Sequence, residues 1–324
     1  MKTIRFHELG NPEVLKLEEV EKPCPAAGEV LVKVHVAGVN FADTLLRRGG
    51  YAVAPALPET PGFEAAGVVE SVGEGVDQTL VGRRVAFMGQ KCYAEYTVAR
   101  TTALMPLADG VSYEQGAAFP VQSLTAYHLL FTMDHARPGM TVLVHAAAGG
   151  MGLQLIQMAK QAGARVFGTT STEAKANQAR EYGADEVILY TQTDFAQRVK
   201  ELTSGRGVDL VLDSVGRATF TSSVKSLAPF GHLVIYGVAS GPPPKLDVIR
   251  TIFQKSQKVS AFWLFTTAQT PEVAARGVKQ VTEWVAAGKL KLPIGLKLPL
   301  AQAAEAHRKM EARETAGKIL LTVS

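Results

Sequence analysis

The sequence lacks the features that would assign it to several specialised classes of protein. Its two cysteines, Cys24 and Cys92, offer no disulfide framework and no C-x-x-C pair, which is consistent with a reducing compartment. No stretch approaches the roughly 20 apolar residues of a membrane span, and the charged N-terminus MKTIRFHELG lacks the apolar core of a signal peptide. The net charge of +4 is spread along the chain, so a nucleic-acid partner is not implied. Together these absences predict a cytoplasmic globular protein without a membrane partner.

Two patterns divide the 324 residues. Residues 1–120 are typical of short strands punctuated by glycine and proline, with one short helix after Asn40, and they predict a compact β-barrel. Residues 121–264 carry six apolar strands separated by helices at βαβ spacing, which predicts a doubly wound parallel sheet. The strands are expected near TVLVHA, RVFGTT, EVILY, DLVLDS, HLVIYG and KVSAFWL.

The last part of the chain does not fit a complete six-stranded sheet. Two amphipathic helices, at 271–287 and 300–313, precede a final strand KILLTV. We therefore expect residues 265–324 to return to the first domain. The predicted domains are residues 1–120 with 265–324, and residues 121–264.

The stretch TVLVHAAAGGMG from Thr141 to Gly152 is the most informative motif. A buried strand runs into a small-residue turn and then into a helix beginning near Gly150, which is the context that a G-x-G-x-x-G fingerprint requires, here with Ala147 in the first place. Small residues let a pyrophosphate approach main-chain N–H groups and the helix N-terminus. The sequence therefore predicts that Ala148, Gly149, Gly150, Met151 and Gly152 bind a dinucleotide.

The region after the second strand of this domain indicates which dinucleotide. NAD-specific folds place an acidic residue about 20 residues past the turn, whereas this chain has Gly168-Thr169-Thr170-Ser171-Thr172 there. A 2′-phosphate would not be repelled, and Lys175 and the hydroxyls of residues 170–172 can bind it. This predicts NADPH. The alternative is that Lys175 is a solvated helix lysine and Tyr190 a strand-end aromatic.

Several ordered motifs resemble those of the zinc-independent medium-chain dehydrogenases/reductases, specifically the NADPH:quinone oxidoreductase or zeta-crystallin-like family. They are GVNFADTLLRRGGY (38–51), PGFEAAGVVESVG (61–73), AAAGGMG (146–152), LDSVG (212–216) and ARETAGKILL (312–321). The resemblance covers essentially the whole chain. It implies a GroES-like β-barrel domain joined to a Rossmann NADPH-binding domain.

The same motifs argue against a catalytic metal. Zinc-dependent relatives place a cysteine, a histidine and a second cysteine around the ion, and the matching positions here are Asn40, Phe63 and Val121. The sequence has no H-E-x-x-H or comparable cluster either. We therefore expect no zinc.

The resemblance also implies further cofactor contacts. Ser171, Lys175 and Tyr190 align with positions that hold the adenosine phosphate end in the family. Other residues are expected near the cofactor, although each has an ordinary structural alternative such as a tight turn, core packing or an exposed helix position. They are Asn40, Tyr51, Thr125, Gly237, Val238, Phe262, Trp263, Leu264 and Arg313.

Because NADPH supplies the hydride, few catalytic side chains are needed. Asn40, Asp43 and Tyr51 are the candidates that the first domain contributes: Tyr51 as a hydrogen-bond or proton donor, and Asn40 to orient the carboxamide or the substrate. For Asp43 the alternative is a helix N-terminal carboxylate that interacts with the dipole or with Arg47.

The expected activity is hydride transfer from NADPH to quinones. An NADPH-dependent enoyl or alkenal C=C reductase is the alternative, because fold does not choose between them. A non-enzymatic NADPH-binding structural or RNA-binding protein is a further alternative, disfavoured by the lack of a clustered basic patch. The apolar sixth strand, Val259 to Leu264, favours a homodimer formed by extending the sheet.

Overall fold

The computed structural model describes residues 1–323 and divides the chain into two compact units. Unit 1 consists of Met1–Gln122 and Val278–Ser324, and unit 2 of Ser123–Gly277. The first boundary falls inside helix α3 (Pro120–Tyr127) and the second inside helix α9 (Pro271–Ala286), not before α9 at residue 264.

Unit 1 is built mainly from strands. A seven-stranded sheet has the order β14-β15-β3-β4-β5-β7, with β6 also paired to β3, and β1 and β2 form a separate hairpin. Helix α1 follows Asn40, where the sequence predicts one short helix. The elements are β1 (Lys2–Arg5), β2 (Lys16–Glu19), β3 (Glu29–Val39), α1 (Phe41–Arg48), β4 (Glu64–Val72), β5 (Arg84–Met88), β6 (Tyr96–Arg100), β7 (Leu104–Pro106), α2 (Tyr113–Ala118), β14 (Ile294–Pro299), α10 (Ala303–Glu311) and β15 (Lys318–Thr322).

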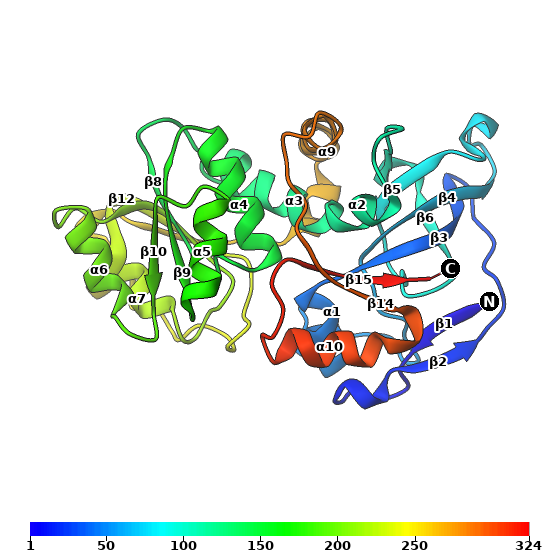
Figure 1. Cartoon of the computed structure of the whole chain (residues 1–324), viewed down its shortest axis with the longest axis horizontal. Helices are drawn as coiled ribbons and strands as arrows, with labels where there is room; N and C mark the ends of the chain where they lie inside the picture. Colours follow the sequence, from blue (N-terminus) through cyan, green and yellow to red (C-terminus); the bar gives the residue numbers. More distant parts are fainter. Residues whose placement is uncertain (324) are drawn as a thin grey trace. The chain divides into compact units, whose positions relative to one another are not determined.

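The C-terminal strand returns to unit 1, as the sequence predicts. β15 pairs with β14 in parallel and with β3 in antiparallel orientation, with Ile319 opposite Val39. Ile319, Leu320 and Leu321 are fully buried. Burial of these three apolar side chains holds the tail of the chain against the longest strand of unit 1 (Figure 1).

Unit 2 confirms the predicted doubly wound sheet. Its six strands have the order β10-β9-β8-β11-β12-β13, and every neighbouring pair is parallel. The order in which successive strands are added to the sheet therefore reverses between β8 and β11. Ligands bind at this point in such folds, at the carboxyl ends of the strands. The elements are β8 (Thr141–Val144), α4 (Gly150–Gln161), β9 (Arg165–Thr170), α5 (Glu173–Glu181), β10 (Glu186–Leu189), α6 (Phe195–Leu202), β11 (Val208–Asp213), α7 (Phe220–Ser226), β12 (Leu227–Ile235), α8 (Val248–Thr251) and β13 (Lys258–Ala261).

Helices cover both faces of the sheet in unit 2. Figure 1 shows α4 and α5 on one face and α6 and α7 on the other. The strands between them are apolar without alternation, and all four residues of β8 are buried. On the α6/α7 face, Leu143, Phe167 and Val211 belong to one buried cluster with the helix residues Val199 and Val224. This two-sided burial explains why the strands are continuous apolar runs.

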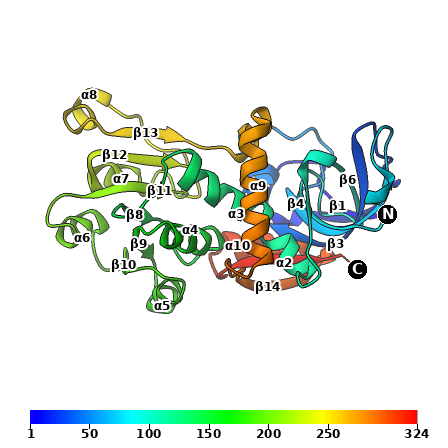
Figure 2. The ribbon, with the colours of Figure 1, turned by 90° about the horizontal axis from the view of Figure 1, so that it is seen from above.

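The sixth strand is shorter than predicted. β13 ends at Ala261, and Trp263 precedes a short 3-10 helix that begins at Leu264, so the predicted strand from Val259 to Leu264 is wrong in its second half. The strand register with β12 covers Lys258 to Ala261, and the Phe262 N–H makes one further hydrogen bond, to the Ile235 carbonyl at 2.8 Å, where β12 ends. β13 is the edge strand of the sheet, next to α8 in Figure 2.

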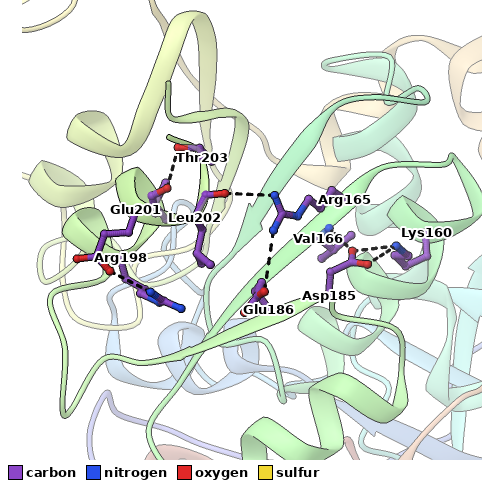
Figure 3. A network of polar contacts seen from close by, with 10 residues as sticks. Lys160, Arg165, Val166, Asp185, Glu186, Arg198, Glu201, Leu202 and Thr203 are labelled. Carbon is purple, nitrogen blue, oxygen red and sulfur yellow. Dashed lines mark hydrogen bonds and ion pairs between the residues drawn. The ribbon is translucent and has the colours of Figure 1, made fainter. Parts of the chain in front are cut away.

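A network of ion pairs ties the amino ends of β9 and β10 to the neighbouring helices (Figure 3). Lys160, in the last turn of α4, donates to both oxygens of Asp185 at 2.8 Å, and the Val166 N–H donates to the same carboxylate at 2.7 Å. Arg165 donates to the Leu202 carbonyl of α6 at 3.2 Å. These ion pairs lie where β9 and β10 begin, at the edge of the sheet opposite the carboxyl ends of the strands.

Within residues 1–323, none of the helices combines the length and the apolar character needed to cross a bilayer.

Candidate functional site

The turn between β8 and α4 presents a helix N-terminus. Ala146 has a left-handed backbone, with φ at 51°, and its carbonyl accepts the Gly149 N–H at 2.9 Å. The Leu153 N–H is the first to donate back along the helix, to the Gly149 carbonyl at 3.0 Å. The N–H groups of residues 150–152 therefore have no acceptor within the helix. Such groups, at the positive end of the helix dipole, bind phosphate.

The close contacts at two glycines show why this turn requires small residues. A Cβ on Gly152 would lie 2.5 Å from the carbonyl oxygens of both Ala146 and Ala147, so the helix approaches the turn too closely for any side chain. A Cβ on Gly168, in β9, would lie 2.7 Å from the Cβ of Ala147. Gly168 thus makes room for the alanine that replaces the first glycine of the fingerprint.

A buried polar network supports the turn between β8 and α4. His145 is fully buried and bonds through Nδ1 to the Thr169 hydroxyl and through Nε2 to the Ser223 hydroxyl, both at 2.9 Å. Ser223 donates to Asp213 at 3.2 Å. Burial lowers the pKa of His145, while the Asp213 charge opposes that shift. These side chains connect the carboxyl ends of β8, β9 and β11 to α7.

Sequence reasoning missed His145 and Asp213 as parts of the site. The signal available for Asp213 was its place at the end of a buried strand, inside the motif LDSVG. His145 carried no signal, because its partners are 24 and 78 residues away in the chain.

The predicted phosphate-end residues come together at the end of β9. The Tyr190 N–H donates to the Thr170 carbonyl at 3.1 Å, and Ser171 follows directly. Thr172 is the N-cap of α5, and its hydroxyl accepts the Lys175 N–H at 3.4 Å. Tyr190 is 44% exposed. Thus Thr170, Ser171, Lys175 and Tyr190 surround one strand end and one helix N-terminus.

One carboxylate, which the sequence-based prediction did not consider, lies near the end of β9. Glu173 begins α5, two residues before Lys175. Arg180 donates to Glu173 at 2.7 Å and forms an ion pair with it on the helix surface. Arg180 therefore offsets the negative charge that Glu173 adds beside the strand end.

The loops after β11 and β12 pack against each other through backbone. Asp213 accepts the Gly216 N–H at 3.0 Å, and Gly216 has φ at 85°. A Cβ on Gly216 would lie 3.3 Å from Cα of Val238, and one on Gly237 would lie 2.8 Å from the Ser214 carbonyl oxygen. The predicted residues Gly237 and Val238 therefore lie at the carboxyl edge of the sheet, beside the LDSVG loop.

The other predicted residues of unit 2 are more scattered. Thr125 lies in α3 and is 9% exposed. The half-buried Phe262 ring lies 6.1 Å from the His128 ring, Trp263 is 39% exposed, and Leu264 is buried. Their roles toward a cofactor stay predictions.

In unit 1, Asn40 and Asp43 form the start of α1. Asn40 is the N-cap residue, and its backbone N–H donates to Asp43 Oδ2 at 2.7 Å. The same oxygen accepts the Tyr93 hydroxyl at 3.0 Å. Asp43 is fully buried, and this burial raises its pKa to about 7, against the lowering effects of the Asn40 and Tyr93 hydrogen bonds. Asp43 thus accepts a hydrogen bond at the N-terminus of α1 and holds the backbone of Asn40 in place.

Arg47 does not pair with Asp43. Its guanidinium donates to Glu311 of α10 at 2.5 Å, so the alternative of an Asp43–Arg47 pair is wrong. The reason is tertiary, because α10 packs against α1. His307, one turn before Glu311, is buried, and this burial lowers its pKa to about 3. Its Nε2 lies 3.3 Å from the Tyr93 hydroxyl.

Tyr51 and Arg313 lie in loops of unit 1. The Tyr51 ring is partly exposed and lies 5.3 Å from the Phe63 ring, tilted by 34°. Arg313 follows α10 and is exposed with φ at 59°. Neither position by itself establishes contact with a ligand.

The three residues predicted to match zinc-ligand positions of relatives lie around or next to Glu64. The Asn40 amide and the Val121 N–H each donate to the Glu64 carboxylate at 2.7 Å, and Phe63 is its chain neighbour. Lys318 completes this group as the ion-pair partner of Glu64. Across residues 1–323, no group of three or more His, Cys, Asp or Glu side chains is arranged to hold a metal ion.

Family models match both parts of the chain. The alcohol dehydrogenase GroES-like domain matches residues 26–125, and the model described as zinc-binding dehydrogenase matches residues 150–279. A GroES-like domain combined with a doubly wound nucleotide-binding unit defines the medium-chain dehydrogenase/reductase class.

Individual relatives narrow this class. The quinone oxidoreductase of Pseudomonas aeruginosa is 39% identical, with 99% of each chain covered. The crystal structure of Escherichia coli quinone oxidoreductase complexed with NADPH has a TM-score of 0.95 at 36% identity, covering 100% of both chains. A 2-haloacrylate reductase of Burkholderia sp is 36% identical over 98% of this chain and 97% of its own. The chain belongs to the quinone oxidoreductase family of the medium-chain dehydrogenases/reductases.

Proposed function

We propose that this protein is an NADPH-dependent oxidoreductase that transfers a hydride to quinones without a metal ion. The observation that carries the proposal is that Thr170, Ser171, the first turn of α5 with Lys175, and Tyr190 lie at one strand end, and we propose that they bind the 2′-phosphate. The only carboxylate beside it, among residues 170–175, is that of Glu173, which pairs with Arg180. The family relation supports the same cofactor, because the Escherichia coli relative is known in complex with NADPH.

Unit 2 fits this cofactor because the turn before α4 has no large side chains. The glycines at 149 and 152, the N–H groups of residues 150–152 and the backbone of Ala148 and Met151 are proposed to bind the pyrophosphate. Lys175 would contribute a charge-assisted hydrogen bond to the 2′-phosphate. Further contacts are proposed from Thr125, Gly237, Val238, Phe262, Trp263, Leu264 and Arg313.

When bound, NADPH supplies the hydride, so the remaining task of the protein is to hold the acceptor and provide for a proton. We propose that Asn40 hydrogen-bonds a polar group of the acceptor or cofactor, and that Tyr51 donates a hydrogen bond or a proton through its phenol. Asp43 acts through Asn40: it is buried and bonded to the Asn40 backbone, so it positions that residue.

Metal independence is supported by the residues that stand at the relatives' ligand positions. Asn40, Phe63 and Val121 offer an amide, a benzyl ring and an isopropyl group, none of which is a zinc ligand of the usual sulfur, imidazole or carboxylate type. Glu64 is already engaged by Lys318, Asn40 and Val121.

A second candidate is reduction of an activated C=C bond. The 2-haloacrylate reductase relative, at 36% identity, favours it. Delivering hydride to a β-carbon creates an enolate, so this chemistry depends more strongly on a proton donor than quinone reduction does. Tyr51 is the residue on which the two candidates differ.

We also propose a cytoplasmic homodimer. Both cysteines are free thiols, which suits a reducing compartment. The edge strand β13 and the segment before it support sheet extension, because Val248, Ile249 and Phe253 are 52%, 64% and 66% exposed. Sedimentation analysis tests this: a monomer across the micromolar range would remove the proposal.

The central experiment follows NADPH oxidation with a panel of ortho- and para-quinones beside α,β-unsaturated ketones, aldehydes and thioesters. We expect turnover with quinones and a preference for NADPH over NADH. Efficient turnover of an enone with no quinone activity would overturn the first candidate in favour of the second. A preference for NADH would defeat the argument from Lys175, while leaving the acceptor question to the panel.

A further inference from the structure

Lys318 is a charged residue in a place that excludes water. It is the first residue of β15, and its side chain is 1% exposed. Because Ile319 lies opposite Val39 in the antiparallel pair, the register brings Lys318 beside Asn40. A buried ammonium requires a partner of opposite charge and full hydrogen bonding, so this lysine has a specific local role.

Its charge partner is a carboxylate that the fold makes room for. The Glu64 side chain is fully buried and forms the ion pair with Lys318. A Cβ on Gly38 would lie 2.7 Å from Glu64 Oε1, so the missing side chain of Gly38 leaves the space that this carboxylate fills. The other oxygen, Oε2, accepts the Val121 N–H at 2.7 Å.

Asn40 is held at both ends by this pair. Its Nδ2 donates to Glu64 Oε1 at 2.7 Å, and its Oδ1 accepts from the Lys318 ammonium at 2.8 Å. Only an acceptor can face Lys318 and only a donor can face Glu64, so the amide has one orientation. The second Nδ2 hydrogen remains after these two bonds.

We propose that Lys318 is a positioning residue, which together with Glu64 fixes the Asn40 amide in the orientation that binds the electron acceptor. This inference rests on the proposed function, in which Asn40 contacts the acceptor or cofactor. Because Glu64 and Lys318 are charged, both of their hydrogen bonds to the Asn40 amide are charge-assisted and therefore stronger than bonds between neutral groups. The ion pair therefore pre-organises Asn40 before any ligand arrives.

A double-mutant cycle separates positioning from simple structural support. Lys318→Met, Asn40→Ala and the double variant are compared in the full chain by kcat and KM for the acceptor that the wild type reduces best. We expect each single change to raise the acceptor KM about tenfold, and the double variant to be no worse than either. Additive losses would show that Lys318 does not act through Asn40 and would overturn the proposal.

A second comparison covers the case in which Lys318→Met fails to fold. Glu64→Gln/Lys318→Met removes both buried charges, and such pairs are often replaceable without loss of stability. We expect this variant to recover the Tm of the wild type but to keep the raised acceptor KM. Recovery of KM together with Tm would reduce the pair to a structural role and overturn the proposal.

The orientation of Asn40 is also measurable without turnover. The chain has three asparagines, Asn11, Asn40 and Asn177, so asparagine-selective 15N labelling gives three side-chain amide signals. We expect Lys318→Met and Glu64→Gln each to move the Asn40 signal, while Asn177 of unit 2 serves as the unmoved reference. An unmoved Asn40 signal would overturn the proposal. Because no acceptor is present, this outcome is independent of the proposed function, which fails instead if the wild type reduces no quinone.

Discussion

The nucleotide turn of unit 2 and the Asn40 cluster of unit 1, defined as Asn40, Glu64 and Lys318, use opposite physical means. The turn works by absence: Gly149 and Gly152 keep side chains away from a helix N-terminus. The Asn40 cluster depends on close polar contacts: two buried opposite charges and one amide hydrogen-bond one another at less than 3 Å. The first region leaves N–H groups at a helix N-terminus without side chains over them, and the second is pre-arranged among its own residues.

The difference concerns which kind of change each region tolerates. Any added volume damages a site made of empty space, whereas a site made of buried charges is damaged by removing one partner. The four predictions below challenge this contrast, beginning with the largest expected effect.

Gly152→Val should abolish cofactor binding. Its Cβ would lie 2.5 Å from two carbonyl oxygens, so α4 must move away from the turn. We expect the Kd for NADPH to rise more than about 100-fold, measured by fluorescence titration. Gly110→Val is the matched control, because a Cβ at Gly110 meets nothing within 4 Å. An unchanged Kd in Gly152→Val would remove close packing as the reason for this glycine.

Asp43 should make the stability of unit 1 depend on pH. Burial raises its pKa from 3.8 to about 7, so between these values the folded state holds a proton that the unfolded state has released. The free energy of unfolding therefore falls as pH rises through this window, by at most about 1.4 kcal/mol per pH unit, and levels off above about pH 7.

Asp43→Asn should remove that slope. Urea unfolding at about pH 5, 6, 7 and 8 compares it with the wild type and with Asp109→Asn, an exposed control. Equal slopes in Asp43→Asn and the wild type would show that burial does not keep this carboxyl protonated.

Lys175→Gln should affect only the phosphorylated cofactor. Loss of one charge-assisted hydrogen bond is expected to raise the Kd for NADPH about tenfold and to leave the Kd for NADH unchanged. Lys200→Gln, an exposed lysine on α6, controls for the loss of one positive charge on unit 2. Equal losses for both cofactors would indicate that Lys175 supports the fold and does not bind the 2′-phosphate.

Tyr51→Phe should have the smallest effect. The ring next to Phe63 is kept and only the hydroxyl is lost, so we expect less than about a threefold change in the rate of quinone reduction. Tyr51→Ala, which also loses the ring, is the comparison and should be worse. A loss of about a hundredfold or more in Tyr51→Phe would assign it as an obligatory acid and favour the C=C reductase.

The fold was largely predictable because its signals are local. Apolar runs such as Val142 to Val144, followed by a small-residue turn, indicate a buried strand and a helix within a dozen residues, and the six strands take the predicted parallel order. The sixth strand was predicted too long because apolar residues continue past Ala261, whereas its partner β12 ends at Ile235, whose carbonyl accepts the Phe262 N–H.

The predicted site residues differ in how well sequence could interpret them. Thr170, Ser171 and Lys175 could be grouped because they follow one strand end within a few residues, and Tyr190 joined them through the family resemblance. Asp43 could not be interpreted: its burial and its bond to Tyr93 join residues 50 apart in the chain. Lys318 matched a family motif but had no assignable role, because its partners are 278 and 254 residues away.

The sequence by itself determined the two-part architecture and the small-residue turn after β8, and it predicted that Asn40, Phe63 and Val121 match zinc-ligand positions of relatives. Each of these depends on residue type and short-range spacing, which a chain carries in one dimension. Only the tertiary structure decided that β15 brings Lys318 to Asn40 and Glu64, and that Arg47 pairs with Glu311 instead of Asp43. Those contacts arise from strand register and helix packing, which bring together residues that no local pattern connects.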